Sequence, residues 1–397
     1  MKMPVYEVGL ELGIEWESAD ASHKDRYVFS EFDIEHADIP ASLREDLTGL
    51  GPGDTLSQTY PPGELVAPYD TSNIRQIQKA DFRTRFSVAL HPGRFYPRKF
   101  IATALQGSQN DNRPFRLLSV DGDMLQIDLN HPLSLRPIDL TATVLAPLQS
   151  GGNAPAQQDM IAALCDSGPG LQANSPEITT EFITDSAFRR SDTQDDAEFY
   201  QQPRLVAHLD ETALDQFKDL YTRFVKPGMK VLDLMSSWKS HLPEDVAPLH
   251  VTGLGMNVEE MRGNTQLNDY VVFDLNQSAE LPFAPQQFDL AICTVSVEYL
   301  INPFNVFQQV ARALKPGAAF VVSFSERWFP PKVVQVWTEL HPFERMGLVL
   351  EYFRQAKAFS RLATESLRGL PRPPNDKYAQ AMSYSDPLYA VWGYAKP

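Results

Sequence analysis

Short apolar runs alternate with helical patterns in the second half of the chain. The runs have the length of buried strands and cover residues 230–234, 250–254, 270–273, 288–295 and 319–324. Asp210 can cap a helix that runs to Phe224, and a second helix is expected at about 302–314, with a stop at Lys315-Pro316-Gly317. Apolar strands separated by helices are typical of parallel sheets with right-handed crossovers. The pattern therefore predicts an open α/β sheet over residues 199–397.

The first half of the chain has a different pattern. Residues 5–16 alternate apolar and other side chains as a strand does, and residues 39–50 form a short helical stretch before the turn at 51–53. Short strand-like runs follow at residues 100–105, 115–120, 124–129 and 138–144. These features predict a β-rich domain with one short helix over residues 1–146. Residues 147–198 are typical of a linker that holds one short helix near 160–165.

Length and composition narrow the classes of function. The chain has 397 residues, which suggests two or three domains, and a formal net charge of −16. We expect no nucleic-acid partner, because attraction to a polyanion needs a basic field. The two cysteines, Cys165 and Cys293, predict neither a disulfide framework nor a metal site built on thiolates. The first residues lack a signal-peptide pattern and no apolar run reaches about 18 residues, so a cytoplasmic protein without a membrane partner is expected.

Candidate chemistry gathers where the predicted parallel strands end. Open α/β sheets bind ligands at the carboxyl ends of their strands. Asp233 ends the first predicted strand before a turn with Ser236 and Ser237, and Asp274 follows the third strand. The runs Leu281-Pro282-Phe283 with Phe288-Asp289, and then Arg312 to Gly317, come before the later strands. With these motifs in this order, residues 199–397 resemble the class I S-adenosylmethionine-dependent methyltransferases of the type 11 kind.

This resemblance implies a Rossmann-like domain with S-adenosyl-L-methionine as its cofactor. The residues that it places at the cofactor are Asp233, Ser236, Ser237, Asn257, Asp274, Leu275 and Thr294. Gly255 stands where the family usually has a ribose-binding carboxylate, and Asn257 is expected to bind the ribose instead. Asp274 is expected to accept a hydrogen bond from adenine. Each residue also has a structural alternative, because carboxylates can cap strand ends and serines can simply form the turn.

The methyl acceptor is expected near the end of the fourth predicted strand. Ser296, Glu298 and Tyr299 are candidates to border it, although packing is the favoured role of Tyr299, and Cys293 is interpreted as a small buried hydrophobe. The cofactor's methyl group is already activated, so the protein must mainly hold the acceptor in line and exclude water. The acceptor is a small molecule or a polypeptide. A dinucleotide reductase is less favoured, because the turn at 236–238 lacks the glycines of G-x-G-x-x-G.

The N-terminal half has a motif of its own. Asp128-Leu129-Asn130-His131-Pro132-Leu133, together with residues 47–54 and 66–70, resembles the FKBP-type prolyl isomerases, and their SlyD-like branch most closely. The resemblance implies an FKBP-like α+β domain over residues 1–146 with a flap domain inserted at about 73–127. It also implies that Tyr69 lines an apolar cup for proline and that His131 supports the cup, with Phe32 and Leu43 as walls. Tyr69 and His131 can instead be core or turn residues of a retained scaffold.

Three hypotheses follow for the whole chain. The leading one is a methyltransferase fused to an FKBP-like domain that recruits a polypeptide or helps folding. The alternative is a peptidyl-prolyl cis-trans isomerase that acts on proline-containing polypeptide clients, while the C-terminal domain only binds the cofactor. The third is a non-catalytic scaffold. Cofactor affinity separates the first hypothesis from the third, and turnover of a proline peptide identifies the second.

Overall fold

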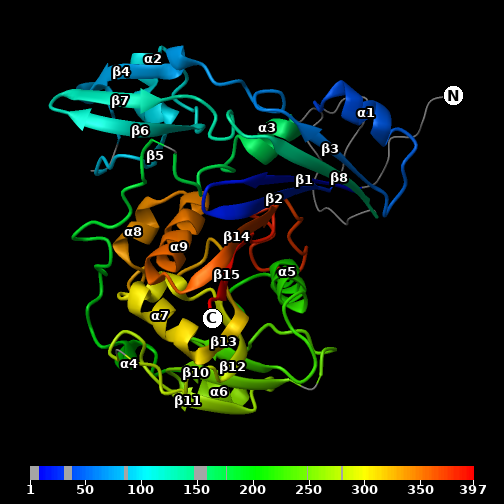
Figure 1. Ribbon diagram of the computed structural model, residues 1–397, viewed down its shortest axis with the longest axis vertical. Helices are drawn as coiled ribbons and strands as arrows, with labels where there is room; N and C mark the ends of the chain where they lie inside the picture. The colour runs from blue at the N-terminus through cyan, green and yellow to red at the C-terminus, as the bar shows by residue number, and fades with distance from the viewer. Residues whose placement is uncertain are drawn as a thin grey trace. The chain divides into compact units, whose positions relative to one another are not determined.

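The computed structural model describes residues 9–30, 38–84, 88–146, 159–175, 177–247, 249–278 and 280–397, and Figure 1 shows their helices and strands. The chain divides into two compact units. The N-terminal unit comprises Met1–Thr184 and Leu340–Leu348, and the C-terminal unit comprises Asp185–Glu339 and Val349–Pro397. Each unit has its own buried core, so each is described by itself.

A mainly parallel sheet forms the centre of the C-terminal unit. Its strand order is β11-β10-β9-β12-β13-β15-β14. The parallel strands are β9 (Lys230–Leu234), β10 (His250–Gly255), β11 (Asp269–Val272), β12 (Phe288–Thr294) and β13 (Leu314–Phe324). The strands β14 (Phe359–Arg368) and β15 (Leu388–Ala395) add antiparallel to this set. The predicted open α/β sheet is therefore confirmed, whereas the pattern of residues gave no indication of the two antiparallel strands.

Helices connect the strands of this sheet. They are α4 (Asp196–Phe199), α5 (Glu211–Thr222), α6 (Val258–Gly263), the short turn η4 (Val297–Tyr299), α7 (Pro303–Ala313), α8 (Gln335–Glu339) and α9 (Pro342–Ala356), whose first residues belong to the N-terminal unit. As predicted, Asp210 caps α5, and its Oδ1 accepts a hydrogen bond from the Ala213 N–H at 3.1 Å. Helix α7 begins with Pro303, which suits a first helical position, and it buries Val306, Phe307 and Val310.

One predicted boundary needs correction. Lys315-Pro316-Gly317 was expected to be a stop between a helix and a strand, but these residues belong to β13, which begins at Leu314. Phe288 pairs with Leu314, and the register then shifts before Leu290 pairs with Ala319. Gly317 has a φ of 79°, a left-handed conformation that glycine adopts without strain. The strand thus absorbs the turn residues as an irregularity rather than starting after them.

Two antiparallel sheets make up the N-terminal unit. The first has the order β2-β1-β8-β3, from β1 (Gly9–Glu17), β2 (Ala21–Phe29), β3 (Thr55–Tyr60) and β8 (Ile138–Leu145). Its core includes residues of α1 (Ala41–Leu47) and α3 (Met160–Cys165). Residues 5–8 of the predicted first strand lie outside the described residues. The predicted short helices near 39–50 and 160–165 are confirmed by α1 and α3.

The second sheet lies in sequence between β3 and β8. Its order is β4-β7-β6-β5, from β4 (Ile74–Gln78), β5 (Phe95–Pro97), β6 (Pro114–Asp121) and β7 (Met124–Asp128). The short turns η1 (Thr71–Asn73), η2 (Lys79–Asp81) and η3 (Arg98–Ile101) and the helix α2 (Ala102–Leu105) complete it. The predicted strand at 100–105 is wrong, because these residues form η3 and α2. Ile101 and Ala102 are buried there, and a short apolar run does not distinguish a buried helix from a strand.

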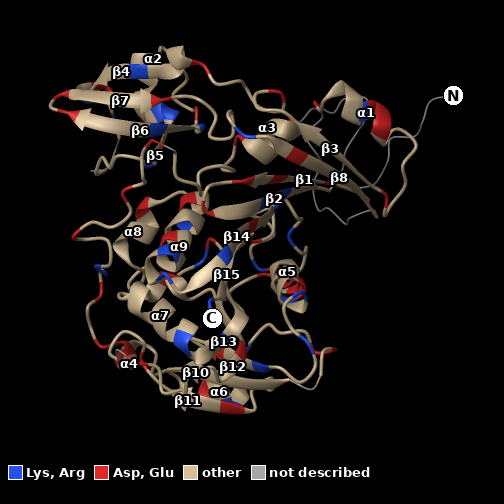
Figure 2. Ribbon diagram, in the orientation of Figure 1, with Lys and Arg blue, Asp and Glu red and all other residues tan. Residues whose placement is uncertain are grey.

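Cys165 and Cys293 are both buried, and neither forms a disulfide. Among the described residues, no group of three or more His, Cys, Asp or Glu side chains could hold a metal ion. No helix in the described part of the chain is both long enough and apolar enough to cross a membrane. Acidic and basic residues both occur on α5 and α6, so charge is mixed along these helices (Figure 2).

Candidate functional site

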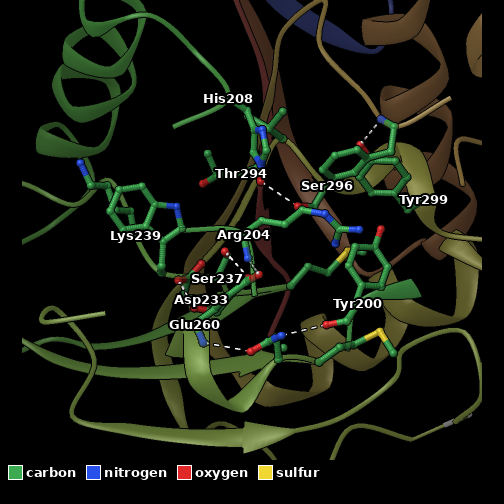
Figure 3. Close-up of a pocket in the computed structure, with 18 of the residues that line it drawn as sticks. Tyr200, Arg204, His208, Asp233, Ser237, Lys239, Glu260, Thr294, Ser296 and Tyr299 are labelled. Carbon is green, nitrogen blue, oxygen red and sulfur yellow. Dashed lines mark hydrogen bonds between the residues drawn. The ribbon is translucent and has the colours of Figure 1, made fainter. Parts of the chain in front are cut away.

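A cavity of about 330 Å³ opens at the carboxyl ends of the parallel strands in the C-terminal unit. Parallel strands end at one edge of a sheet, so residues that follow β9, β10, β11 and β12 meet there. Figure 3 shows the side chains around this cavity. The structure brings together on its lining Asp233, Ser236, Ser237, Asn257, Asp274, Leu275, Thr294, Ser296 and Tyr299. The role of these residues at a cofactor stays a prediction.

Asp233 is a buried carboxylate at the end of β9, with 3 % of its surface exposed. Its Oδ2 accepts hydrogen bonds from the Ser236 Oγ at 2.6 Å and the Ser240 Oγ at 2.7 Å. Burial raises the pKa of Asp233 to about 6, although the two hydroxyl donors act in the opposite direction. A carboxylate that is desolvated to this degree gains from a cationic or hydrogen-bond-donating ligand.

The turn after β9 leaves no room for a side chain at position 255. The Ser236 N–H donates to the Leu254 carbonyl at 2.8 Å, which draws the turn onto the end of β10. A Cβ atom at Gly255 would lie 2.1 Å from the Ser236 carbonyl oxygen. The carboxylate that the family usually has at this position therefore cannot fit beside this turn.

Glu260 is a carboxylate on the cavity that sequence reasoning missed. It lies in the first turn of α6, it is 9 % exposed, and it lines the cavity. Its Oε2 accepts from the Ser237 Oγ at 2.6 Å, and its Oε1 accepts from the backbone N–H of Arg204 at 2.7 Å. Acidic residues are common in a first helical turn because of the helix dipole, so Glu260 carried no distinctive signal. It places a carboxylate on the cavity five residues after Gly255.

Asn257 has a structural role that its sequence position did not reveal. Its Oδ1 accepts hydrogen bonds from the N–H groups of Glu259 and Glu260 at 2.9 and 3.0 Å, which caps α6. Its Nδ2 donates to the carbonyl oxygens of Tyr200 and Gln201 at 2.8 and 3.2 Å. The amide thus joins α6 to the segment before it, and these four bonds use its main donor and acceptor positions.

Asp274 and Asn276 follow β11 and form the next part of the wall. The Asp274 Oδ1 accepts from the Asn276 N–H at 2.8 Å. The pKa of Asp274 is raised, first by burial and also by the nearby carboxylates of Asp196 and Asp195. Asn276 donates to Asp196 at 3.0 Å and to the Tyr299 carbonyl at 3.0 Å. The wall therefore includes a carboxylate whose ionised form would be stabilised by a cation or a hydrogen-bond donor of a ligand.

The segment before α5 is fixed to this wall by a buried ion pair. Lys332 is fully buried, and its Nζ lies 3.1 Å from Asp196 and 3.2 Å from Asp192. Arg190 pairs with the other oxygen of Asp196 at 2.7 Å. These contacts hold residues 190–200 and so position Tyr200 on the cavity. A segment whose only regular structure is the short helix α4 can be held rigidly when its charges are paired in this way.

Thr294 and Tyr299 lie at and after the end of β12. The Thr294 Oγ1 shares a hydrogen bond of 2.5 Å with the Tyr221 hydroxyl, which also contacts the Ser323 Oγ at 2.6 Å. The Tyr299 hydroxyl accepts from the Phe329 N–H at 2.8 Å, and the two rings stack with centroids 6.0 Å apart. Burial raises the pKa of Tyr299 well above its usual range. Tyr299 therefore stays protonated and acts as a wall rather than as a base.

Glu298 does not lie where it was expected. The side chain is buried, with 1 % exposed, and it is not part of the cavity lining. Within the turn η4, Tyr299 lines the cavity while its neighbour Glu298 does not. A single turn of helix sends adjacent side chains in different directions, which sequence alone did not resolve. This corrects the expectation that Glu298 borders the acceptor.

The N-terminal unit has a cavity of its own, of about 530 Å³. His131 lines it together with Ile39, Leu65, Val66 and Asp166. The His131 Nδ1 accepts from the Leu133 N–H at 3.1 Å, and its Nε2 lies 3.3 Å from the Cys165 carbonyl oxygen. Burial lowers the pKa of His131. A neutral ring with both nitrogens in hydrogen bonds to the backbone holds a turn in place.

Tyr69 and the two expected apolar walls are not on this cavity. Tyr69 is 39 % exposed and does not line it, which corrects the expectation that it forms a cup for proline. The residues beside it, Ala67 and Pro68, line the cavity instead. Leu43 is fully buried in the core of the first sheet rather than on the cavity. Phe32 lies outside the described residues.

Comparisons with known proteins concern the C-terminal unit. Residues 240–322 match the family model of a methyltransferase domain. The chain is 26% identical over 164 residues to a demethylmenaquinone methyltransferase of Paenarthrobacter aurescens (strain TC1), covering 40% of this chain and 62% of that protein. It is 30% identical over 109 residues to cycloartenol-C-24-methyltransferase 1 of Oryza sativa subsp. japonica, covering 25% of this chain and 31% of that protein. The chain thus spans less than two thirds of the length of these relatives.

Solved structures of methyltransferases are also similar. A putative methyltransferase from Bacillus halodurans C-125 has 14% identity and a TM-score of 0.33, covering 47% of this chain and 99% of that chain. A SAM-dependent methyltransferase from Aquifex aeolicus has 16% identity and a TM-score of 0.30, covering 50% of this chain and 97% of that chain. The family match supports a methyltransferase domain with S-adenosyl-L-methionine as its cofactor. That match includes no residue of 1–146, so an FKBP-like fold there stays a prediction.

Proposed function

We propose that the C-terminal unit transfers the methyl group of S-adenosyl-L-methionine to a small-molecule or polypeptide acceptor. The observation that carries this proposal is the group of carboxylates on one cavity at the strand ends, Asp233, Glu260 and Asp274. The match of residues 240–322 to a methyltransferase domain supports it.

The donor and acceptor groups of the cavity suit this cofactor. Its ammonium, ribose hydroxyl and adenine amino groups are all hydrogen-bond donors, and its sulfonium is a cation. Asp233 and Glu260 are buried acceptors, and Asp274 is a half-buried one. The largest departure from the family pattern is Gly255, where the turn at Ser236 occupies the space of a side chain. Glu260 lines the cavity and could bind the ribose in place of the carboxylate that the family usually has at the position of Gly255.

When bound, the cofactor supplies a methyl group that is activated by its positive sulfur. The residues of this chain then have to bind and orient the cofactor and the acceptor, and they have to exclude water. Asp233 and the turn at 236–238 would hold the amino-acid part, Glu260 the ribose and Asp274 the adenine. Thr294, fixed by Tyr221, and Tyr299, fixed by the Phe329 N–H, would border the methyl side.

Two potentially reactive side chains near this side, Cys293 and Tyr299, take no part in the proposed chemistry. Cys293 is buried, and burial raises the pKa of its thiol well above the usual range. Tyr299 is protonated for the same reason. Neither group is therefore a nucleophile or a base at neutral pH. The acceptor itself must carry the nucleophilic atom.

Calorimetric titration of the full chain with S-adenosylhomocysteine, the demethylated product, tests this function. We expect saturable binding, and we expect Glu260→Gln to weaken it about tenfold, because a hydrogen bond to a charged group is lost. Glu259→Gln is the matched control, since Glu259 is the exposed neighbour on the same helix and should change affinity by less than about twofold. Absence of binding at millimolar ligand would contradict the proposal.

A second candidate function concerns the N-terminal unit, for which we propose binding or isomerisation of proline-containing polypeptides. Its support is the cavity beside His131, whose lining combines the apolar residues Ile39, Leu65 and Val66 with charged residues, among them Arg98, Arg113 and Asp166. Desolvation in an apolar cup favours the twisted state of an X–Pro bond, whose rotational barrier is near 20 kcal/mol. In a fused chain, this unit would recruit or refold a polypeptide.

A protease-coupled assay with a proline tetrapeptide tests this candidate. We expect the full chain to speed isomerisation and Ala67→Arg to abolish the effect, because Ala67 is exposed and lines the cavity. Because position 67 is exposed, an arginine there would fill the cavity without forcing an additional side chain into the hydrophobic core. A wild-type chain without activity would contradict isomerisation and leave binding alone, and an activity that Ala67→Arg does not change would show that this cavity is not the site.

A further inference from the structure

Charge is distributed unevenly around the cavity of the C-terminal unit. Asp233 and Glu260 are buried, whereas Lys239 and Lys377 are exposed on the same cavity. Arg204, which is half-buried, is a third cation of the lining. We call Arg204, Lys239 and Lys377 the basic rim. It is notable because the chain as a whole has a net charge of −16.

Within the described part of the chain, none of the three rim cations forms an ion pair with a carboxylate at salt-bridge distance, although Lys377 lies near enough to Asp376 to lower the pKa of that carboxyl. The Lys239 Nζ lies 4.6 Å from the ring centre of Trp238, and the Lys377 Nζ lies 4.9 Å from that of Tyr378. The Arg204 guanidinium lies 4.6 Å from the Phe199 ring and 5.2 Å from the Phe329 ring. Arg327 differs, because its Nε donates to Asp386 at 2.9 Å. Cations over aromatic rings keep their charge and remain able to pair with an anion.

The rim alternates with flat apolar surfaces. Trp238, Phe329 and Tyr378 all line the cavity, and Tyr299 stacks on Phe329 with an interplanar angle of 28°. His208 lies edge-on to Phe329, with ring centres 5.2 Å apart. Burial and the charge of Arg204 lower the pKa of His208, so its ring is neutral near pH 7. Aromatic walls of this kind favour a planar ligand.

The part of the rim at Lys377 is held in place by buried charges. It lies in the segment between β14 and β15, where Arg372 pairs with Asp376 at 3.0 Å and with Asp386 at 3.0 Å. Arg372 also lies 3.3 Å from Asp210, the residue that caps α5. Asp210 in turn accepts from the Asp386 N–H at 2.7 Å. The segment is therefore an ordered wall of the cavity rather than a loose connection.

We propose that the methyl acceptor is a planar aromatic molecule that carries an anionic group, such as a carboxylate. This inference rests on the proposed methyltransferase function. The ring would lie against Trp238, Phe329 or Tyr378, and the anion would pair with the basic rim. The cofactor brings only one carboxylate of its own, so it does not account for three cations. The buried carboxylates would hold the cationic cofactor, and the rim would hold the anionic acceptor.

The transfer itself balances without a further reactant. The nucleophilic atom of the acceptor forms the bond to the methyl carbon while the carbon–sulfur bond breaks. The electron pair of that bond stays on sulfur, which becomes a neutral thioether. The proton of the acceptor's nucleophilic group passes to bulk water.

Ligand binding to the full chain, saturated with S-adenosylhomocysteine, tests the acceptor class. The probes are 2-naphthoate and 2-naphthol, which share a ring system and differ in charge. We expect naphthoate to bind at least about tenfold more tightly at low salt, and this preference to shrink as salt rises, because exposed charges are screened. Lys377→Glu should weaken naphthoate about fivefold and change naphthol less than about twofold.

Lys218→Glu is the control for a change of net charge, because Lys218 is exposed on α5 and does not line the cavity. It should leave the preference for naphthoate unchanged. Equal or tighter binding of naphthol, no binding of either probe, or equal effects of the two substitutions would overturn the inference. Failure of S-adenosylhomocysteine to bind would instead contradict the methyltransferase function itself, so the two failures are distinguishable.

Discussion

A polar residue on the cavity of each unit, His131 in one and Asp233 in the other, differs in what it is bonded to. In the N-terminal unit, both nitrogens of His131 are within hydrogen-bond distance of backbone groups. In the C-terminal unit, Asp233 is buried with only hydroxyl donors, and its pKa is raised to about 6. A neutral ring that is hydrogen-bonded to the backbone on both sides maintains the fold. A desolvated carboxylate without a cationic partner can instead interact strongly with a ligand that supplies a cation or a hydrogen-bond donor.

The largest expected effect comes from restoring the family's carboxylate with Gly255→Asp. The new Cβ would lie 2.1 Å from the Ser236 carbonyl oxygen, so the turn after β9 must move. We expect a loss of about 3 kcal/mol or more in the free energy of unfolding, measured with urea. Gly263→Ala is the control, because its Cβ meets only Leu205 at 3.8 Å. A Gly255→Asp variant as stable as the wild type would show that the turn adapts.

Asp274→Ala should have the next largest effect. It removes the acceptor that we assign to the adenine amino group, and we expect S-adenosylhomocysteine to bind about 10- to 100-fold more weakly in a calorimetric titration. Asp269→Ala provides the comparison, since Asp269 is an exposed residue of β11 that pairs with His250. Equal affinities of the Asp274 variant and the wild type would remove Asp274 from the site.

His131→Ala tests whether the N-terminal cavity is held together by that ring. The Leu133 N–H and the Cys165 carbonyl would lose their partner, so we expect a loss of about 1–2 kcal/mol in the free energy of unfolding. Denaturation by urea measures it. An unchanged stability combined with loss of proline-peptide turnover would give His131 a chemical role and would weaken the contrast between the cavities.

Tyr69→Ala should have the smallest effect. The side chain is exposed and does not line the cavity, so we expect less than about 0.5 kcal/mol in stability. The rate of proline-peptide turnover should also stay as in the wild type. A variant that folds normally but loses turnover would show that Tyr69 contributes to proline binding, as its sequence motif implied.

The sequence predicted the central strands well because they are apolar on both faces. Strand β9 has the predicted bounds, and Asp233 lies at its end as expected. The antiparallel strands β14 and β15 follow no distinctive motif and were missed. Residues 100–105 were misassigned, since burial of Ile101 and Ala102 suits a helix as well as a strand.

Site residues were harder to predict where a side chain's direction depends on its neighbours. Glu298 and Tyr299 are adjacent, but only Tyr299 lines the cavity. Glu260 was missed because a first-turn acid suits any helix. Asn257 was identified, but its bonds to Tyr200 and Gln201 join segments that are distant in sequence. Such contacts depend on how the chain folds back, which local pattern does not encode.

The most direct test of the account compares wild type and Asp233→Asn in titrations with S-adenosylhomocysteine at pH 8 and pH 5. The pKa of Asp233 is about 6 in the folded chain, so the carboxylate is ionised at pH 8 and mostly protonated at pH 5. We expect the wild type to bind about tenfold more tightly than the variant at pH 8, and about equally at pH 5. Equal affinities at both pH values, or no binding by the wild type, would contradict the claim that this buried carboxylate holds the cofactor.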